Sequence, residues 1–482
     1  MKRGALIALI ALGLGGCASQ RAALPETARL PAEVEVVRSG DRWIADYRFD
    51  RDAPAWVLAR SPLARVSGKP WRPESWTIET PGVRLERRGW YDALVADAGS
   101  VPRNVRVRFT PFSKDIETDY DPALVFTDGS VALFDQQFKI FPVASVEEVA
   151  TLPIDYSTIP ATETATRVTF RDAAGRVLHG GRRQQSVTFD DAGTYVMFGP
   201  AKPIVTREMA TIIDPELPGW LRTFLARSTP DLLTRFAAEL GPPPPGPAPT
   251  VMVSWNGPTA GLQSMGGSVL PGLVVMTFEG VGVIAENAEM RHKARAFIAH
   301  ESAHFWLGQA VAYQFARDAW IMEGGADLLA IRAVAAIDST YDARAELQRA
   351  VDECVTHLAG GSVSSAHERS APRAHYGCGT LFGLVAEAAS GKTFADYMRP
   401  LIDANREDKV LTRGEWLQAL DVASGDPALS RDIARLLDEP SPDPKAAIAS
   451  LLARAGVPYE IVEGSPRLLP ENDRAERTAL RP

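Results

Sequence analysis

Apolar and polar residues alternate along the first part of the chain, over residues 33–204. Apolar residues occupy every second position in several short runs, at 43–49, 105–109, 187–189 and 195–197. This period of two is typical of half-buried β-strands. Turn-forming stretches rich in Gly, Pro and Asp separate the runs. The pattern therefore predicts an antiparallel, sandwich-like β-domain over this part of the chain.

The pattern becomes mainly helical after residue 205. Two apolar runs, 250–255 and 272–278, still predict strands, but beyond residue 285 the apolar residues recur at helical spacing. The fold class is therefore α+β. The final residues 465–482 are polar and are expected to be a disordered tail. The ranges expected to be helical are 286–316, 320–337, 341–358 and 375–390, preceded by two short helices within 218–240 and followed by shorter ones to about 455.

The N-terminus has the pattern of a targeting segment. Two basic residues precede an uncharged apolar run at 4–16, which is too short to span a bilayer as a stable helix. The run ends in Gly-Gly-Cys17, which resembles the bacterial lipobox, whose cysteine becomes lipid-modified. We expect a lipoprotein signal peptide over 1–17 and a tether over 18–32. An ordinary cleavable signal with an incidental cysteine is the alternative.

This targeting segment predicts a location in the bacterial cell envelope. A lipid on Cys17 would anchor the protein in a bilayer, facing the periplasm. Ala18 follows the cysteine, and the lack of an Asp there favours the outer membrane over the inner one. Cys354 and Cys378 are the remaining cysteines, and an even pair in an oxidising compartment predicts a disulfide.

Composition narrows the classes of function. The chain has 482 residues, of which 45% are hydrophobic and 23% charged, a balance that is ordinary for a globular protein. Its formal net charge is −8. A nucleic-acid binder would normally present a basic face, so we expect no nucleic-acid partner.

The chemistry-bearing motif is His300-Glu301-Ser-Ala-His304, an HExxH pattern. The two histidines are four residues apart, so on a helix both imidazoles leave the same face and can bind one metal ion. Glu301 lies beside them and can take a proton from a water molecule that the metal activates. The pattern predicts one Zn²⁺ with Glu301 as the general base.

A third protein ligand is expected for a catalytic zinc. Eighteen residues separate His304 from Glu323, within the segment Trp-Ile-Met-Glu-Gly-Gly-Ala-Asp at 320–327. HExxH-x18-E in this context resembles the gluzincin zinc peptidases of the aminopeptidase N family. The resemblance implies that Glu323 completes the metal site. It also implies a thermolysin-like α/β catalytic domain over 205–392 and a helical C-terminal region over 393–464.

Two further residues have roles to test. Tyr376-Gly-Cys-Gly is similar to the family's Y-x-K-G segment, which implies that Tyr376 donates a hydrogen bond to the oxyanion. A packing role for this ring is the alternative. Asp327 lies one helical turn after Glu323, where it can accept the free N–H of a ligand histidine; an exposed carboxylate is the alternative.

The chain departs from the family in its substrate cleft. The family's G-x-M-E-N segment supplies a glutamate that binds the substrate's free N-terminus. The corresponding stretch here contains Gly266, Gly267 and Ser268 and has no carboxylate, so exopeptidase specificity is in doubt. Glu279 and Glu286 lie later and could take the place of this glutamate only if the loop differs. Cys378 replaces the lysine of Y-x-K-G.

These residues predict a membrane-anchored zinc metallopeptidase that hydrolyses peptide or protein substrates. Two alternatives remain open at the level of sequence. One is a lipoprotein that retains zinc but serves in binding or scaffolding. The other is a zinc hydrolase of a non-peptide substrate, since the same groups stabilise any tetrahedral oxyanion.

Overall fold

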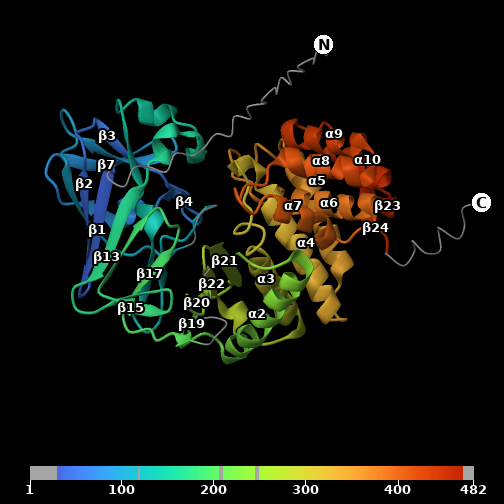
Figure 1. Ribbon diagram of the computed structural model, residues 1–482, viewed down its shortest axis with the longest axis horizontal. Helices are drawn as coiled ribbons and strands as arrows, with labels where there is room; N and C mark the ends of the chain where they lie inside the picture. The colour runs from blue at the N-terminus through green and yellow to red at the C-terminus, as the bar shows by residue number, and fades with distance from the viewer. Residues whose placement is uncertain (1–29, 115, 118–119, 206–209, 245–248, 471–482) are drawn as a thin grey trace, which may run out of the picture.

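The computed structural model describes residues 30–114, 116–117, 120–205, 210–244 and 249–470. In Figure 1 a β-rich half, blue to green, lies on the left, and a largely helical half, green to red, lies on the right. The signal segment and Cys17 lie outside the described residues. In the described part of the chain, no helix is both long enough and apolar enough to cross a membrane.

Within its described residues, the β-rich half contains three sheets of four or more strands. Their strand orders are β16-β13-β1-β2-β9-β6, β10-β11-β17-β14-β15 and β12-β3-β8-β7, with a small β4-β5 hairpin beside them. Aromatic rings fill the space between the sheets, including Trp43, which packs edge-on against Phe198. The strands are β1 Ala32–Ser39, β2 Arg42–Phe49, β3 Ala55–Leu58, β4 Leu63–Ala64, β5 Lys69–Pro70, β6 Trp76–Ile78, β7 Val83–Arg88, β8 Tyr91–Ala96, β9 Asn104–Phe109, β10 Ala123–Val125, β11 Val131–Phe134, β12 Ile140–Val143, β13 Thr166–Asp172, β14 Val177–His179, β15 Arg182–Gln184, β16 Ser186–Asp190 and β17 Tyr195–Phe198.

The prediction of a purely antiparallel domain is wrong, because β1 pairs in parallel with β13 and antiparallel with β2. Alternation reports which face of a strand is buried, not the direction of its neighbour. Val34 lies opposite Val168 in this pair, and both are buried whichever way β13 runs. The tether is also shorter than predicted, since Ala32 already belongs to β1 and is fully buried.

The second half begins with a mixed sheet in the order β18-β19-β20-β22-β21. β19, β20 and β22 are parallel to one another, and β21 is an antiparallel edge strand. One hydrophobic cluster crosses between the halves, since Phe134 and Tyr195 share it with Met252 and Val275. The two halves therefore pack through a common core. The strands are β18 Ile204–Val205, β19 Ala210–Ile213, β20 Thr250–Trp255, β21 Ser264–Leu270 and β22 Leu273–Glu279.

The helices follow the predicted order, with two corrections to their bounds. The region 218–240 is one helix, α2, because Leu225, Leu232 and Phe236 bury one continuous face that outweighs the hydrogen bond lost at Pro230. The helix expected at 286–316 ends at Ala303. The helices are α1 Arg72–Ser75, α2 Gly219–Leu240, α3 Ala288–Ala303, α4 Trp320–Ile337, α5 Ala343–Leu358, α6 Arg373–Ser390, α7 Phe394–Ala404, α8 Arg413–Ser424, α9 Pro427–Asp438 and α10 Pro444–Ala455, with short 3-10 turns at Asp135–Phe138, Glu148–Thr151, Tyr156–Thr158, Pro160–Glu163, Val281–Val283 and Ala316–Asp318.

The predicted disordered tail starts too early. β23 (Tyr459–Val462) and β24 (Ser465–Leu468) form a hairpin after α10, so the region expected to be helical to residue 464 ends in a strand. Gln348 of α5 fixes the hairpin, because its side chain accepts from the Leu468 N–H at 2.7 Å and donates to the Pro466 carbonyl at 3.1 Å. These are tertiary contacts that a polar local sequence does not reveal.

Candidate metal centre

The metal motif lies at the end of α3. The Asn287 side chain accepts from the Met290 N–H at 2.8 Å and begins the helix, and Ala294 and Ile298 bury its inner face. After His304 the chain turns sharply, with Gly308 at a φ of 142°, a conformation that favours glycine. This turn ends the helix and brings the Leu307 carbonyl back to the histidine.

Three donor side chains converge at this point. The Nε2 atoms of His300 and His304 are 3.0 Å apart, and each lies 3.5 Å from Oε2 of Glu323 on α4. One ligand atom from each residue lies within 4.8 Å of the others. The structure thus brings together the three residues that the sequence predicts as metal ligands.

The hydrogen bonds of the two rings leave a space that suits a cation. Nδ1 of His300 lies 2.8 Å from the Asp327 carboxylate, and Nδ1 of His304 lies 2.7 Å from the Leu307 carbonyl. Both partners only accept, so both Nδ1 atoms donate. In neutral rings each Nε2 then carries a lone pair, and the two lone pairs face each other beside a carboxylate. Two imidazoles and one carboxylate form a donor set that fits zinc.

The charges of this cluster act on one another. Burial opposes ionisation of Glu323, but the facing imidazoles hold the pKa of its carboxyl well below the usual range. Burial likewise opposes protonation of His300, yet Asp327 and Glu323 raise the pKa of the ring well above its usual value. Without an ion, the cluster therefore attracts positive charge.

Glu301 is held at the edge of this cluster. It is 4% exposed, and its Oε2 has no hydrogen-bond partner among the described residues. The backbone of β21 passes directly over it, since a Cβ added at Gly267 would lie 2.5 Å from Glu301 Oε1. Gly267 is therefore required for close packing, whereas a Cβ at Gly266 would meet nothing within 4 Å.

Tyr376 reaches the same point from the first turn of α6. Its ring stacks on His300 with centroids 5.8 Å apart, and its hydroxyl lies near the negative charge of Glu323. Burial, together with the nearby Glu323 charge, raises the pKa of this phenol well above its usual value. The hydroxyl thus remains a protonated hydrogen-bond donor at neutral pH.

Close helix packing fixes the position of Tyr376. A Cβ added at Gly324 would overlap the backbone of Gly379, and one at Gly379 would overlap the Trp320 carbonyl. Thr380 Oγ1 also donates to the Gly324 carbonyl at 3.2 Å. α4 and α6 therefore touch backbone to backbone, immediately beside Glu323 and Tyr376.

A disulfide between Cys354 and Cys378 adds a covalent link between α5 and α6. Gly377 packs against the same surface, because a Cβ there would lie 2.9 Å from Glu353 Cβ. Cys378 thus ties the turn that follows Tyr376 to the preceding helix.

The cluster opens into a cleft of about 1800 Å³ that runs between the two halves of the molecule. Gly266, Gly267 and Ser268 of β21 line it, as do the metal-ligand residues, Asp327 and Tyr376. The β-rich half contributes Arg60, Tyr120 and Tyr156 to the opposite wall. Asp155 links the halves beside the cleft by accepting from the Ala316 N–H at 3.2 Å.

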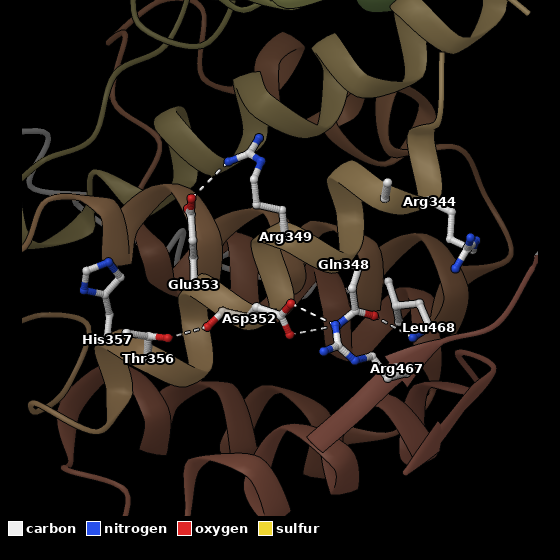
Figure 2. A pocket seen from close by; sticks show the side chains of 10 residues that line it. Arg344, Gln348, Arg349, Asp352, Glu353, Thr356, His357, Arg467 and Leu468 are labelled. Atoms are coloured by element: carbon white, nitrogen blue, oxygen red, sulfur yellow. Dashed lines mark hydrogen bonds and ion pairs between the residues drawn. The ribbon is translucent and has the colours of Figure 1, made fainter. Parts of the chain in front are cut away.

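A second hollow of about 550 Å³ lies on the outer side of α5 and shares Ala345 and Arg349 with the lining of the cleft (Figure 2). Asp352 lies at its centre, within 2.9 Å of the Gln348 amide and 3.0 Å of Arg467. None of the residues that line this hollow belongs to the metal-ligand cluster. The metal-ligand cluster therefore faces the large cleft and not this hollow.

Several cleft residues were missed by reasoning from sequence. Arg60, Tyr120 and Tyr156 come from the β-rich half, which carries no motif, so no local signal marks them. Arg373 was also missed, although it lies one helical turn before Tyr376. His375, the residue before Tyr376, also lines the cleft.

The comparisons with known proteins concern the fold. No protein-family model matches the sequence, and no curated protein sequence matches it. The crystal structure of an aminopeptidase N family protein from Idiomarina loihiensis is similar, with a TM-score of 0.59 and 10% identity over 89% of this chain and 79% of that one. Native leukotriene A4 hydrolase from Saccharomyces cerevisiae is similar with a TM-score of 0.50 and 14% identity, over 86% of this chain and 68% of that one. The chain therefore shares the fold of these two proteins.

Proposed function

We propose that this protein is a zinc-dependent peptidase. The observation that carries the proposal is the convergence of His300, His304 and Glu323 beside a buried Glu301 oxygen that has no partner among the described residues. A buried polar group without a partner costs roughly 1–3 kcal/mol. A protein that held zinc only for binding or scaffolding would gain nothing from the destabilisation that this buried oxygen causes. The shared fold with an aminopeptidase N family protein supports the same proposal.

The residues of this chain divide the chemistry between them. A zinc ion held by His300, His304 and Glu323 would supply Lewis-acid chemistry, which polarises a carbonyl and makes a water molecule more acidic. Glu301 accepts the proton of the attacking water and passes it to the leaving amine. Tyr376 donates a hydrogen bond to the carbonyl oxygen as negative charge develops there.

Substrate binding is assigned to the exposed edge of β21. An extended peptide can add to the free edge of a sheet through main-chain hydrogen bonds. β21 pairs with β22 on one side only and lines the cleft above Glu301. Gln309 already donates to the Val269 carbonyl at 3.1 Å. The part of the edge left for a peptide therefore lies before Val269.

Metal content tests the proposal directly. We expect purified protein to bind about one zinc ion per chain, and Glu323→Ala to lose most of it, because one of three protein ligands is removed. Chelation should abolish peptide hydrolysis and added zinc should restore it. Elemental analysis and turnover of a peptide library measure the two effects.

His292→Ala is the matched control for metal content. His292 lies on α3 two helical turns before His300, and its ring bonds to Thr340 at 3.0 Å. This variant should keep its zinc. Wild-type protein that contains no zinc after refolding with zinc present would refute the assignment.

We further propose that cleavage is not confined to the N-terminal residue of a substrate. Holding a free ammonium group in a partly dry cleft needs a carboxylate partner, and Gly266, Gly267 and Ser268 supply none. Glu279, at the end of β22, already accepts from Thr259 Oγ1 at 2.6 Å. We expect an N-acetylated peptide to be cleaved at least as well as the same peptide with a free N-terminus.

Mass spectrometry of the products from both forms of one peptide measures this expectation. Internal fragments from the acetylated form support the proposal. Stepwise loss of single residues from the free form alone would instead indicate an aminopeptidase that uses Glu279 or another carboxylate.

We also propose that the protein is lipid-anchored in the bacterial cell envelope through Cys17, facing the periplasm and preferentially at the outer membrane. The basic start, the short apolar run and Gly-Gly-Cys17 support this. Cys17→Ala should move the protein from the membrane fraction to the soluble fraction of an expressing bacterium. An unmodified wild-type N-terminus by mass spectrometry would contradict the anchor.

A further inference from the structure

We infer that the cleft wall beside Tyr376 is a subsite for a carboxylate of the substrate, formed by Arg373 and Arg349. The inference rests on the proposed peptidase function and names a chemical class of substrate. Both arginines line the cleft that contains the metal-ligand cluster. Their side chains are 44% and 51% exposed, so both guanidinium groups are accessible to a ligand.

One carboxylate holds the two arginines side by side. Glu353 Oε1 lies 3.0 Å from Arg349 Nη1, and Glu353 Oε2 lies 2.7 Å from Arg373 Nη2. Glu353 is not among the residues that line the cleft; it faces the hollow on the outer side of α5 (Figure 2). Glu353 therefore reaches the pair from the side of that hollow, which Arg349 also lines, whereas Arg373 lines only the cleft. Glu346 also pairs with Arg349, at 2.7 Å, so Arg373 is the less neutralised of the two.

Arg373 lies close to the reaction centre. Its guanidinium carbon is 4.6 Å from the centre of the Tyr376 ring, and the same ring stacks on His300. A chain residue spans roughly 3.3–3.6 Å. A carboxylate bound to Arg373 would therefore belong to a residue one or two positions from the scissile bond.

The start of α6 adds positive potential at the same place. Arg373 is the first residue of this helix, which has no acidic residue in its first turn and no side-chain cap. The N-terminus of a helix carries a partial positive charge. Ser370 and Pro372, which precede the helix, also line the cleft. Nothing in the first turn of α6 neutralises this end of the helix.

His375 provides an independent sign that a ligand belongs here. It is 5% exposed and lines the cleft, and its Nε2 has no hydrogen-bond partner within the described ranges. A neutral imidazole nitrogen can donate to a backbone carbonyl or accept from a backbone N–H, so the main chain of a peptide fits this position. A main-chain contact and a carboxylate contact can both come from one peptide residue.

The rest of the reaction centre explains why such a subsite selects substrates. Glu301, Glu323 and Asp327 are all acidic, and the whole chain has a net charge of −8. A substrate carboxylate would be repelled by these groups unless cations hold it to one side. Planar guanidinium groups bind carboxylates through two parallel hydrogen bonds. The carboxylate can come from an acidic side chain or from the C-terminus of a short peptide.

Calorimetric binding to zinc-loaded Glu301→Gln protein tests the inference without turnover. The probes are acetyl-tetra-alanine with a free C-terminus, the same peptide with a C-terminal amide, and amidated versions that contain Glu or Gln at the third position. We expect a probe that carries a carboxylate to bind about tenfold more tightly than its uncharged partner. The free-acid and Glu probes distinguish the two sources of the carboxylate.

Variants of Arg373 test whether the preference for probes with a carboxylate arises at this site. Arg373→Gln should remove the tenfold difference, and Arg373→Lys should retain part of it. Arg344→Gln is the matched control, because Arg344 is an exposed arginine of the same helix as Arg349 but lies outside the cleft. Equal binding of charged and uncharged probes, absence of binding by all four, or a preference that survives Arg373→Gln would overturn the inference. Failure of the wild type to hydrolyse peptides would refute the peptidase function and leave this binding result standing.

Discussion

Glu301→Gln is expected to lower kcat by about 10²–10⁴-fold while leaving the zinc content unchanged. Glutamine has nearly the same shape as glutamate, so it can keep the packing against Gly267 that the structure requires. It cannot accept the proton of the attacking water. None of the three predicted ligands is altered by this change. Steady-state kinetics with a blocked fluorogenic peptide and elemental analysis of the same sample measure both quantities.

Glu286→Gln is the matched control for this experiment. Glu286 lies just before α3 and pairs with Arg291 at 3.3 Å, with both side chains well exposed. Its replacement should change neither kcat nor zinc content. A Glu301→Gln variant with wild-type kcat would show that a different group acts as the general base.

Tyr376→Phe is expected to lower kcat by about 10²–10³-fold, because one hydrogen-bond donor to the oxyanion is lost. The phenylalanine ring can still stack on His300 and pack beneath Arg373. The thermal midpoint and the zinc content should therefore remain close to those of the wild type. The fall should appear in kcat more than in KM, since the oxyanion exists only along the reaction path.

Tyr459→Phe controls for the loss of a tyrosine hydroxyl elsewhere. Tyr459 begins β23, in the hairpin after α10, and does not line the cleft. This variant should retain full activity. If Tyr376→Phe also retains full activity on a substrate that is turned over, another donor stabilises the oxyanion.

The sequence predicted correctly those residue positions that depend on the geometry of a single helix. Histidines at i and i+4 share one helix face whatever surrounds the helix, and the structure brings His300 and His304 together with Glu323. Asp327 lies at 2.8 Å from His300, because one helical turn separates it from Glu323. The disulfide partners are also together, although only their even number pointed to them.

The sequence was less informative where distant segments meet. The parallel pairing of β1 with β13 joins residues more than 120 positions apart, and alternation cannot show its direction. The end of α3 depends on the turn at Gly308 and on the hydrogen bond from His304 to Leu307. The arginine pair depends on Glu353, which bridges α5 and α6 through an ion pair to each arginine. Each of these features depends on tertiary contacts rather than local pattern.

The backbone contact between Gly324 and Gly379 limits which substitutions this protein can accept. Neither position has room for even a methyl group, so saturation mutagenesis should find both almost intolerant of any replacement. Because no side chains separate α4 from α6 at this point, repacking elsewhere in the core cannot move Glu323 away from Tyr376. Substitutions in the surrounding core would therefore lower the free energy of unfolding before they changed the distance between Glu323 and Tyr376. Changes in selectivity are free to accumulate along the far wall of the cleft, which the β-rich half supplies.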